Sequence, residues 1–207
     1  MARRKPEDIV ALVEGHYDAT EPLRQRMQDD HALYRLEPYD AGEGYQSYTS
    51  NDPQTYAEKV IGWISGAEMT VRIPHDGADA ELREKNDLKE RFLIGVLAAA
   101  DERLCRLMLP TIRDQIGWYS AIRGWYAGRA LLAKRDDGTT YVDITPWDPL
   151  NTYWGTGSDG LEWACYKMAK TKAQIQSQYR IKLEDMDNRD EDGIVVYDFY
   201  DKEMNTI

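Results

Sequence analysis

Tryptophans and carboxylates lie close together along residues 143–163 of this 207-residue chain. Glu162 stands beside Trp163, and Asp148 and Asp159 lie nearby in the sequence. A pair of carboxylates can act as acid and base or nucleophile in glycoside cleavage, and aromatic rings can line such a site. This segment could serve a carbohydrate-binding or glycoside-hydrolase-like domain, which is the alternative function that the sequence leaves open. Chance is the simpler origin of such neighbours, because the chain has 37 acidic residues.

Three glycines in the same segment, Gly155, Gly157 and Gly160, have the GxGxxG spacing that holds a dinucleotide pyrophosphate. That motif requires a buried strand before it and a helix after it. Residues 151–154 are short and half polar, however, and residues 161–163 are typical of a strand. The glycines therefore predict the turn of a β-hairpin, and we expect no bound nucleotide.

A possible calcium loop begins with Asn188, Asp190, Asp192 and Gly193. The twelfth position, where a bidentate carboxylate belongs, is Phe199, and strand-like residues stand between. We interpret this segment as a solvated acidic loop and predict no metal site there.

Histidines and cysteines give no sign of a catalytic or metal centre. His16, His31 and His75 are isolated, and Cys105 and Cys165 have neither a CxxC spacing nor a histidine at ligand spacing. No GxSxG motif is present. We therefore predict a protein that is not an enzyme, with no catalytic residue, no cofactor and no metal. Two cysteines are too few for a disulfide framework, which favours a reducing compartment.

The overall charge is acidic, with 26 Lys and Arg against 37 Asp and Glu and a net charge of −11. Proteins that grip phosphates tightly need the opposite balance. Arg103 and Arg106 could contact a phosphate, but Asp101 and Glu102 beside them predict a solvated, self-paired helix face. The longest apolar run, near residues 93–100, is too short to span a membrane, and the N-terminus does not read as a secretory signal.

The aromatic composition is unusual, with 14 Tyr and 6 Trp but only 2 Phe. Tyr and Trp combine a large apolar ring with a polar edge, which suits interfaces and half-wet surfaces. The candidates for structural or interface roles are Trp118, Trp125, Trp147, Trp154 and Trp163.

Hydrophobic periodicity predicts an α+β fold that is helix-rich first and rich in antiparallel β-hairpins later. We expect a single α+β domain over residues 1–207. Its three parts would be residues 1–66 with helices and an ordered loop, 67–123 with a strand and long helices, and 124–207 with antiparallel strands and one helix. The strand in the middle part falls on residues 68–73, and the loop at 37–50 should be ordered because its three tyrosines need something to pack against.

Several short phrases occur in an order that is distinctive as a set. They are Leu33–Arg35, Tyr45–Asn51, Arg91–Leu97, Trp118–Trp125, Asp143–Thr152 and Gly160–Ala164. With this order and spacing the chain resembles the N-terminal half of the portal proteins of tailed bacteriophages, from about Leu33 to Tyr179. No single phrase is diagnostic, and the family has no catalytic signature.

The resemblance implies a structural head–tail connector, a ring of about twelve subunits at one vertex of the capsid. Through such a ring the terminase motor packages double-stranded DNA, which is later ejected. The implied partners are further copies of the chain, the major capsid and scaffold proteins, terminase, a head–tail adaptor, and DNA that passes without sequence-specific binding. The implied location is the virion, after assembly in the bacterial cytoplasm.

Portal proteins continue beyond this peripheral region, called the wing, into stem helices and a clip that line the tunnel. No segment for these elements precedes Ile207, and the chain stops shortly after an apolar strand. We therefore expect the chain to correspond to the wing alone, cut from a longer protein, and we nominate no residue that contacts DNA.

Overall fold

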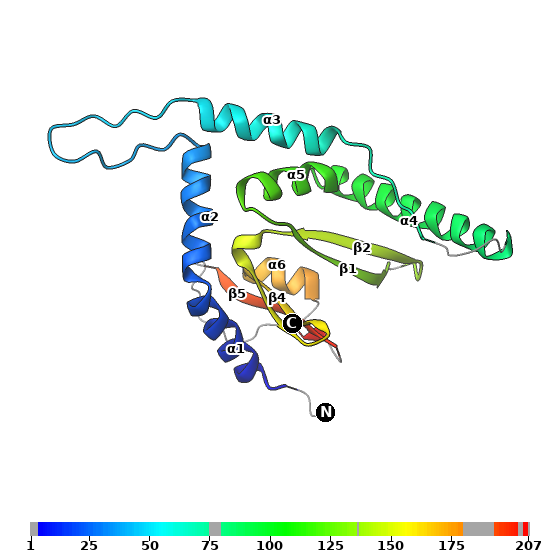
Figure 1. The fold of residues 1–207 in the computed structure, drawn as a ribbon. Coiled ribbons are helices and arrows are strands. Elements are labelled where there is room, and N and C mark those ends of the chain that lie inside the picture. Colours follow the sequence, from blue (N-terminus) through cyan, green and yellow to red (C-terminus); the bar gives the residue numbers. More distant parts are fainter. Residues whose placement is uncertain (1–3, 75–79, 136, 180–192, 203–204, 207) are drawn as a thin grey trace. The chain divides into compact units, whose positions relative to one another are not determined.

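The computed structural model describes residues 4–74, 80–135, 137–179, 193–202 and 205–206. Helices precede antiparallel strands along the chain, which confirms the predicted α+β class (Figure 1). The helices are α1 (Pro6–Ala19), α2 (Glu21–Tyr34), α3 (Asp52–Gly66), α4 (Ala80–Arg106), α5 (Ile112–Ile122), the short 3₁₀ turn η1 (Pro149–Asn151) and α6 (Lys172–Tyr179). The strands are β1 (Ala127–Lys134), β2 (Thr140–Trp147), β3 (Thr152–Gly157), β4 (Gly160–Lys170), β5 (Ile194–Asp201) and β6 (Asn205–Thr206).

The chain divides into two compact units. The first unit combines Met1–Arg26 with Asp148–Ile207, and the second unit is Met27–Trp147. The first unit is therefore built from two distant stretches of sequence, whereas the second is continuous. The single domain expected from the sequence stays a prediction, and each unit is described by itself below.

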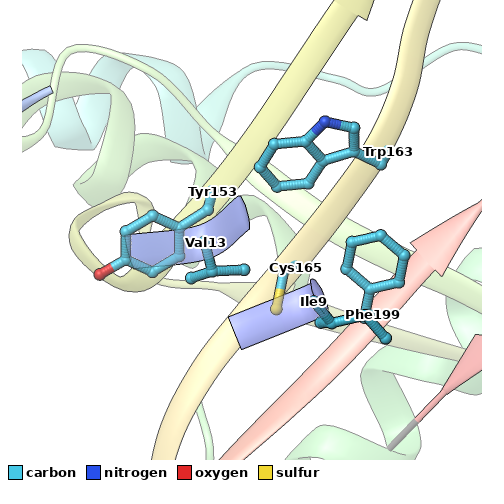
Figure 2. Packing of buried hydrophobic residues seen from close by; sticks show 6 residues of the cluster. All are labelled: Ile9, Val13, Tyr153, Trp163, Cys165 and Phe199. Carbon is cyan, nitrogen blue, oxygen red and sulfur yellow. The ribbon is translucent and has the colours of Figure 1, made fainter. Parts of the chain in front are cut away.

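The core of the first unit lies between α1 and an antiparallel sheet of order β3-β4-β5-β6. Ile9 and Val13 stand four residues apart and so share one face of α1. They pack against Tyr153, Cys165 and Phe199 from three successive strands, as Figure 2 shows. All five side chains are almost fully buried, and burying each apolar one contributes about 1.5–3 kcal/mol to folding.

The turn between β3 and β4 confirms the hairpin that the three glycines predict. Gly157 pairs with Gly160 across the turn, and Gly160 has a positive φ of 97°, which favours glycine. Gly155 lies directly beneath the indole ring of Trp163, so closely that a Cβ atom there would overlap the ring. The glycine spacing thus serves a turn and a close ring contact.

The second unit joins α3, α4 and α5 to the β1–β2 hairpin. The register runs from Ala127 opposite Trp147 to Lys134 opposite Thr140, so these strands form an antiparallel hairpin, in agreement with the antiparallel strands expected after residue 124. Helix α5 begins at a cap in which the Thr111 side chain accepts a hydrogen bond from the backbone N–H of Asp114. The core between these elements contains Ala100, Leu104 and Ile112.

The strand predicted over residues 68–73 is wrong. These residues contain no strand, and a side chain from α4 takes the place of a neighbouring strand. The backbone N–H of Ile73 donates to Glu90 Oε1 at 2.7 Å, and Arg72 lies 3.7 Å from the other oxygen of Glu90. An alternating pattern is therefore not sufficient for a strand, because a strand also needs a partner for its backbone groups.

Candidate assembly surface

A groove of about 540 Å³ lies between α4 and the β1–β2 hairpin in the second unit. Its lining is mostly apolar and includes Phe92 and Val96 from α4 with Leu132 and Val142 from the hairpin. The Phe92 side chain is 63% exposed and that of Leu132 is 80% exposed. Large apolar residues gathered around a concavity mark a binding surface more often than isolated ones do.

The groove and the core use different sides of α4. Ala100 and Leu104 are buried against α5 and β2. Phe92 lines the groove and is 63% exposed, and at about 100° per residue it stands about 120° around the helix from Leu104. Leu88 is a further turn away in the chain and is 70% exposed. The side of α4 that carries Phe92 is therefore left largely uncovered, and the hairpin beside it completes the groove.

An ionic cluster holds one wall of the groove. Arg103 on α4 and Arg129 on β1 both contact the Asp143 carboxylate, with N–O distances of 2.5 and 2.8 Å. Arg103 also donates to the backbone carbonyl of Ile144 at 2.7 Å. One carboxylate shared by two guanidinium groups leaves a local excess of positive charge. The predicted self-pairing of the α4 face therefore holds for Arg106, which pairs with Glu102, and is wrong for Arg103.

A second cation stands at the rim of the groove. Arg135 follows β1, is exposed, and its guanidinium carbon lies 5.0 Å above the centre of the Tyr141 ring. The groove residues include two arginines and no aspartate or glutamate among the described lining. The groove is therefore apolar with a positive bias, although the chain as a whole is strongly acidic.

Further apolar side chains are exposed on α3. Tyr56 and Trp63 are 71% and 74% exposed, and they stand seven residues apart, which places them on one face of the helix. The opposite side of α3 meets α5, where Gly117 approaches Ser65 so closely that a Cβ atom on it would lie 2.8 Å from the hydroxyl. This exposed pair was not identified from the sequence, although its spacing was a readable signal.

The loop over residues 37–50, called the arm below, also presents aromatic rings to solvent. Tyr39, Tyr45 and Tyr48 are 58%, 80% and 80% exposed. The other described residues of the chain leave these rings largely uncovered, so the expectation that they need something to pack against stays a prediction. Figure 1 shows the arm projecting away from the start of α3. A hydrogen bond within the arm shapes its bend: the Asp40 carboxylate accepts from the backbone N–H of Gly42 at 2.9 Å.

Of the five tryptophans predicted for structural or interface roles, Trp163 belongs to the core of the first unit. Trp147 and Trp163 are buried, at 4% and 8% exposure, and Trp163 stacks on Phe199. Trp118, Trp125 and Trp154 are partly buried. The exposed indole is that of Trp63, so the surface candidates come mainly from tyrosine, leucine and phenylalanine.

The acidic and aromatic segment 143–163 is divided between the two units after Trp147. The Asp148 carboxylate accepts a hydrogen bond from the backbone N–H of Leu150 at 2.9 Å and so caps the η1 turn. Asp159 and Glu162 are exposed near the β3–β4 turn. This arrangement does not favour the carbohydrate hypothesis, which stays a prediction.

A polar cluster in the first unit fastens α1 to the sheet. Glu14 accepts hydrogen bonds from Lys167 at 2.8 Å and from the Tyr197 hydroxyl at 2.9 Å. Both hydrogen bonds lower the pKa of Glu14, and the one from Lys167 lowers it more. Arg24 donates to the Tyr153 hydroxyl at 2.9 Å in the same unit. Each group is engaged with a neighbour across the sheet, which indicates a structural clasp.

Two titratable side chains of the first unit, His16 and Cys165, have pKa values shifted by burial. His16 has ring contacts with Trp154 and Trp163, at centroid distances of 4.9 and 5.7 Å, and burial lowers its pKa. Burial also raises the pKa of the Cys165 thiol to about 12, so it stays protonated. Within the described residues no three His, Cys, Asp or Glu side chains converge as metal ligands. Residues 188–192 of the candidate calcium loop, and His75, lie outside that part of the chain.

Comparison with models of known protein families and with curated proteins finds no match for the chain. Among the helices that the structure describes, none combines the length and apolar character needed to cross a membrane.

Proposed function

We propose that this chain is the wing part of a bacteriophage portal protein, a non-enzymatic subunit that assembles with its own copies into a ring. In this proposal the ring, of about twelve subunits, occupies one capsid vertex and carries double-stranded DNA during packaging and ejection. Capsid and scaffold proteins, terminase and a head–tail adaptor would be its other partners. These particulars come from the resemblance in the sequence.

The observation that supports assembly is the amount of apolar surface that the second unit leaves uncovered. Among the described residues of this unit, the large apolar side chains that are at least 58% exposed are Tyr39, Tyr45, Tyr48, Tyr56, Trp63, Leu88, Phe92, Leu107, Met108 and Leu132. Aromatic side chains of this kind supply most of the binding energy in protein interfaces. A subunit that buries them against its neighbours would gain stability that the isolated chain lacks.

The distribution of this surface also suits a ring. A closed ring uses head-to-tail contacts, so each subunit needs two different faces that fit each other. The second unit offers a concave face, the groove beside α4, and convex features, the arm and the exposed side of α3. A twofold dimer would instead need one self-complementary patch.

The net negative charge of the chain is compatible with a channel through which DNA passes. With a net charge of −11, the chain has no general attraction for phosphates. Weak contacts suit a channel through which DNA must slide, because tight phosphate contacts would raise the energy needed for each step of translocation.

Electron microscopy of the full chain, together with its mass in solution, tests the proposal. We expect rings with a central opening and a mass that is a multiple of the subunit mass of 23.9 kDa. The double variant Phe92→Ser and Leu132→Ser should lose the rings, whereas Leu161→Ser, which alters an exposed leucine in the first unit, should keep them. Single particles of the unaltered chain at every concentration would refute the proposal.

A further inference from the structure

The groove beside α4 is open in the isolated chain, and its chemistry restricts what can fill it. None of its described lining residues belongs to the arm, so a chain does not fill its own groove with its own arm. An occupant must be apolar enough for Phe92 and Leu132, and it should carry negative charge toward Arg103 and Arg135. It must also be narrow, since the groove holds about 540 Å³.

The arm has each of these properties. Its three tyrosines are exposed, and its charged residues are all acidic, namely Glu37, Asp40 and Glu43, with no lysine or arginine between residues 37 and 50. Its tip is a formed turn in which Gly42 and Gly44 both have φ near +84° and the Tyr45 N–H donates to the Gly42 carbonyl. A preshaped turn loses less conformational entropy on binding than a flexible chain does.

We propose that the arm of one chain docks into the groove of a second copy of the same chain. The occupant is identified by charge complementarity, an acidic aromatic loop against an apolar groove with two arginines. Tyrosine suits such a contact because its ring covers apolar surface while its hydroxyl remains available for hydrogen bonds. This inference deepens the proposed ring and rests on it.

The contact is head-to-tail, because the arm and the groove are different parts of the second unit. Each chain that lends its arm keeps an open groove for the next chain. Repetition of one such contact therefore continues from chain to chain until the series closes, which is the behaviour that a ring requires. The exposed pair on α3, next to the arm in sequence, would extend the same interface.

Cross-linking of mixed cysteine variants tests the contact directly. Cys105 is exposed and is first replaced by serine, while buried Cys165 stays. Full chains with Gln46→Cys in the arm are mixed with full chains carrying Thr140→Cys at the groove and treated with a short bismaleimide. Both positions are exposed, and neither is one of the apolar residues on which the contact depends. The matched control replaces Thr140→Cys by Thr156→Cys, an exposed threonine in the first unit.

We expect at least about tenfold more cross-linked dimer from the arm and groove pair than from the control, because docked groups reach millimolar effective concentrations. Arg135→Glu should weaken self-association about tenfold through like-charge repulsion with the arm, and adding Glu43→Lys to it should restore association. Equal cross-linking in both mixtures, or no effect of the charge reversal, overturns the inference.

Electron microscopy of the same samples separates the two proposals. Rings without arm-to-groove cross-links would overturn the docking contact and leave the ring standing. Specific cross-links without rings would support the contact and overturn the ring. If the samples show no rings and no specific cross-links, both proposals are overturned.

Discussion

Replacing Asp143 by asparagine should destabilise the second unit by removing the charge that two arginines share. Asp143 lies on β2, and its side chain is 15% exposed. It holds Arg103 of α4 and Arg129 of β1, so it joins the long helix to the hairpin at the wall of the groove. Asparagine has nearly the same shape, so the variant changes charge with little change in packing.

The size of the effect follows from the contacts that are lost. A hydrogen bond to a charged group contributes about 1.5–3 kcal/mol, and removing one member of a fully buried ion pair costs about 3–5 kcal/mol, which is an upper bound for this partly exposed cluster. The amide oxygen of asparagine can still accept one hydrogen bond, while two guanidinium groups remain close together without a counter-charge. We therefore expect the free energy of unfolding to fall by about 3 kcal/mol.

Urea unfolding followed by circular dichroism measures this change. With a slope of about 2 kcal/mol per molar urea, the midpoint of the second unit should fall by about 1.5 M. The matched control is Glu102→Gln, which removes a carboxylate from an exposed pair with Arg106 on α4 and should cost less than about 0.5 kcal/mol. Equal midpoints for Asp143→Asn and the control would refute the argument that the shared carboxylate joins helix and hairpin.

Three further predictions concern the first unit. Gly155→Ala should lower the free energy of unfolding by about 1–3 kcal/mol, measured in urea, because the new methyl group displaces the Trp163 ring. A thiol reagent at neutral pH should modify one cysteine per native chain and both after unfolding, because burial raises the pKa of Cys165 to about 12. Glu14→Gln should reduce the loss of stability in acid: the hydrogen bond from Lys167 lowers the Glu14 pKa, so its stabilisation is complete above about pH 4.5 and disappears as the pH falls through the lowered value.

Each of these three predictions can be contradicted by a specific result. The control is Gly95→Ala, because a Cβ atom at Gly95 meets open space. If Gly155→Ala has the same free energy of unfolding as Gly95→Ala, the close contact with the Trp163 ring is contradicted. Equal reaction rates of the two native thiols would contradict the burial of one of them. Unchanged acid unfolding of Glu14→Gln would show that the clasp on α1 does not stabilise the fold.

The local elements could be predicted because their signals lie within a few residues. The Gly138 turn, with φ of 83°, and the Gly160 turn each mark a hairpin, and the Thr111 cap marks the start of α5. Turn geometry and capping depend on backbone conformation at single positions, so the residue types alone indicate them.

The candidate surface could not be predicted in the same way, because exposure depends on which elements meet. Helix α4 carries apolar residues on more than one side, and Phe92 on one side is 63% exposed while Leu104 on another is 2% exposed. The clasp between Glu14 and Lys167 joins residues that are 153 positions apart. No periodicity within a short window carries information of that kind.

The divided sequence of the first unit has a consequence for synthesis on the ribosome. The continuous stretch Met27–Trp147 leaves the ribosome before any strand of β3–β6, so the second unit can fold while the chain is still growing. Helix α1 emerges first of all, but its partners Tyr153, Cys165 and Phe199 emerge last. The apolar face of α1 therefore has no sheet to pack against during most of translation. Folding of the first unit is the late step in the folding of each nascent chain.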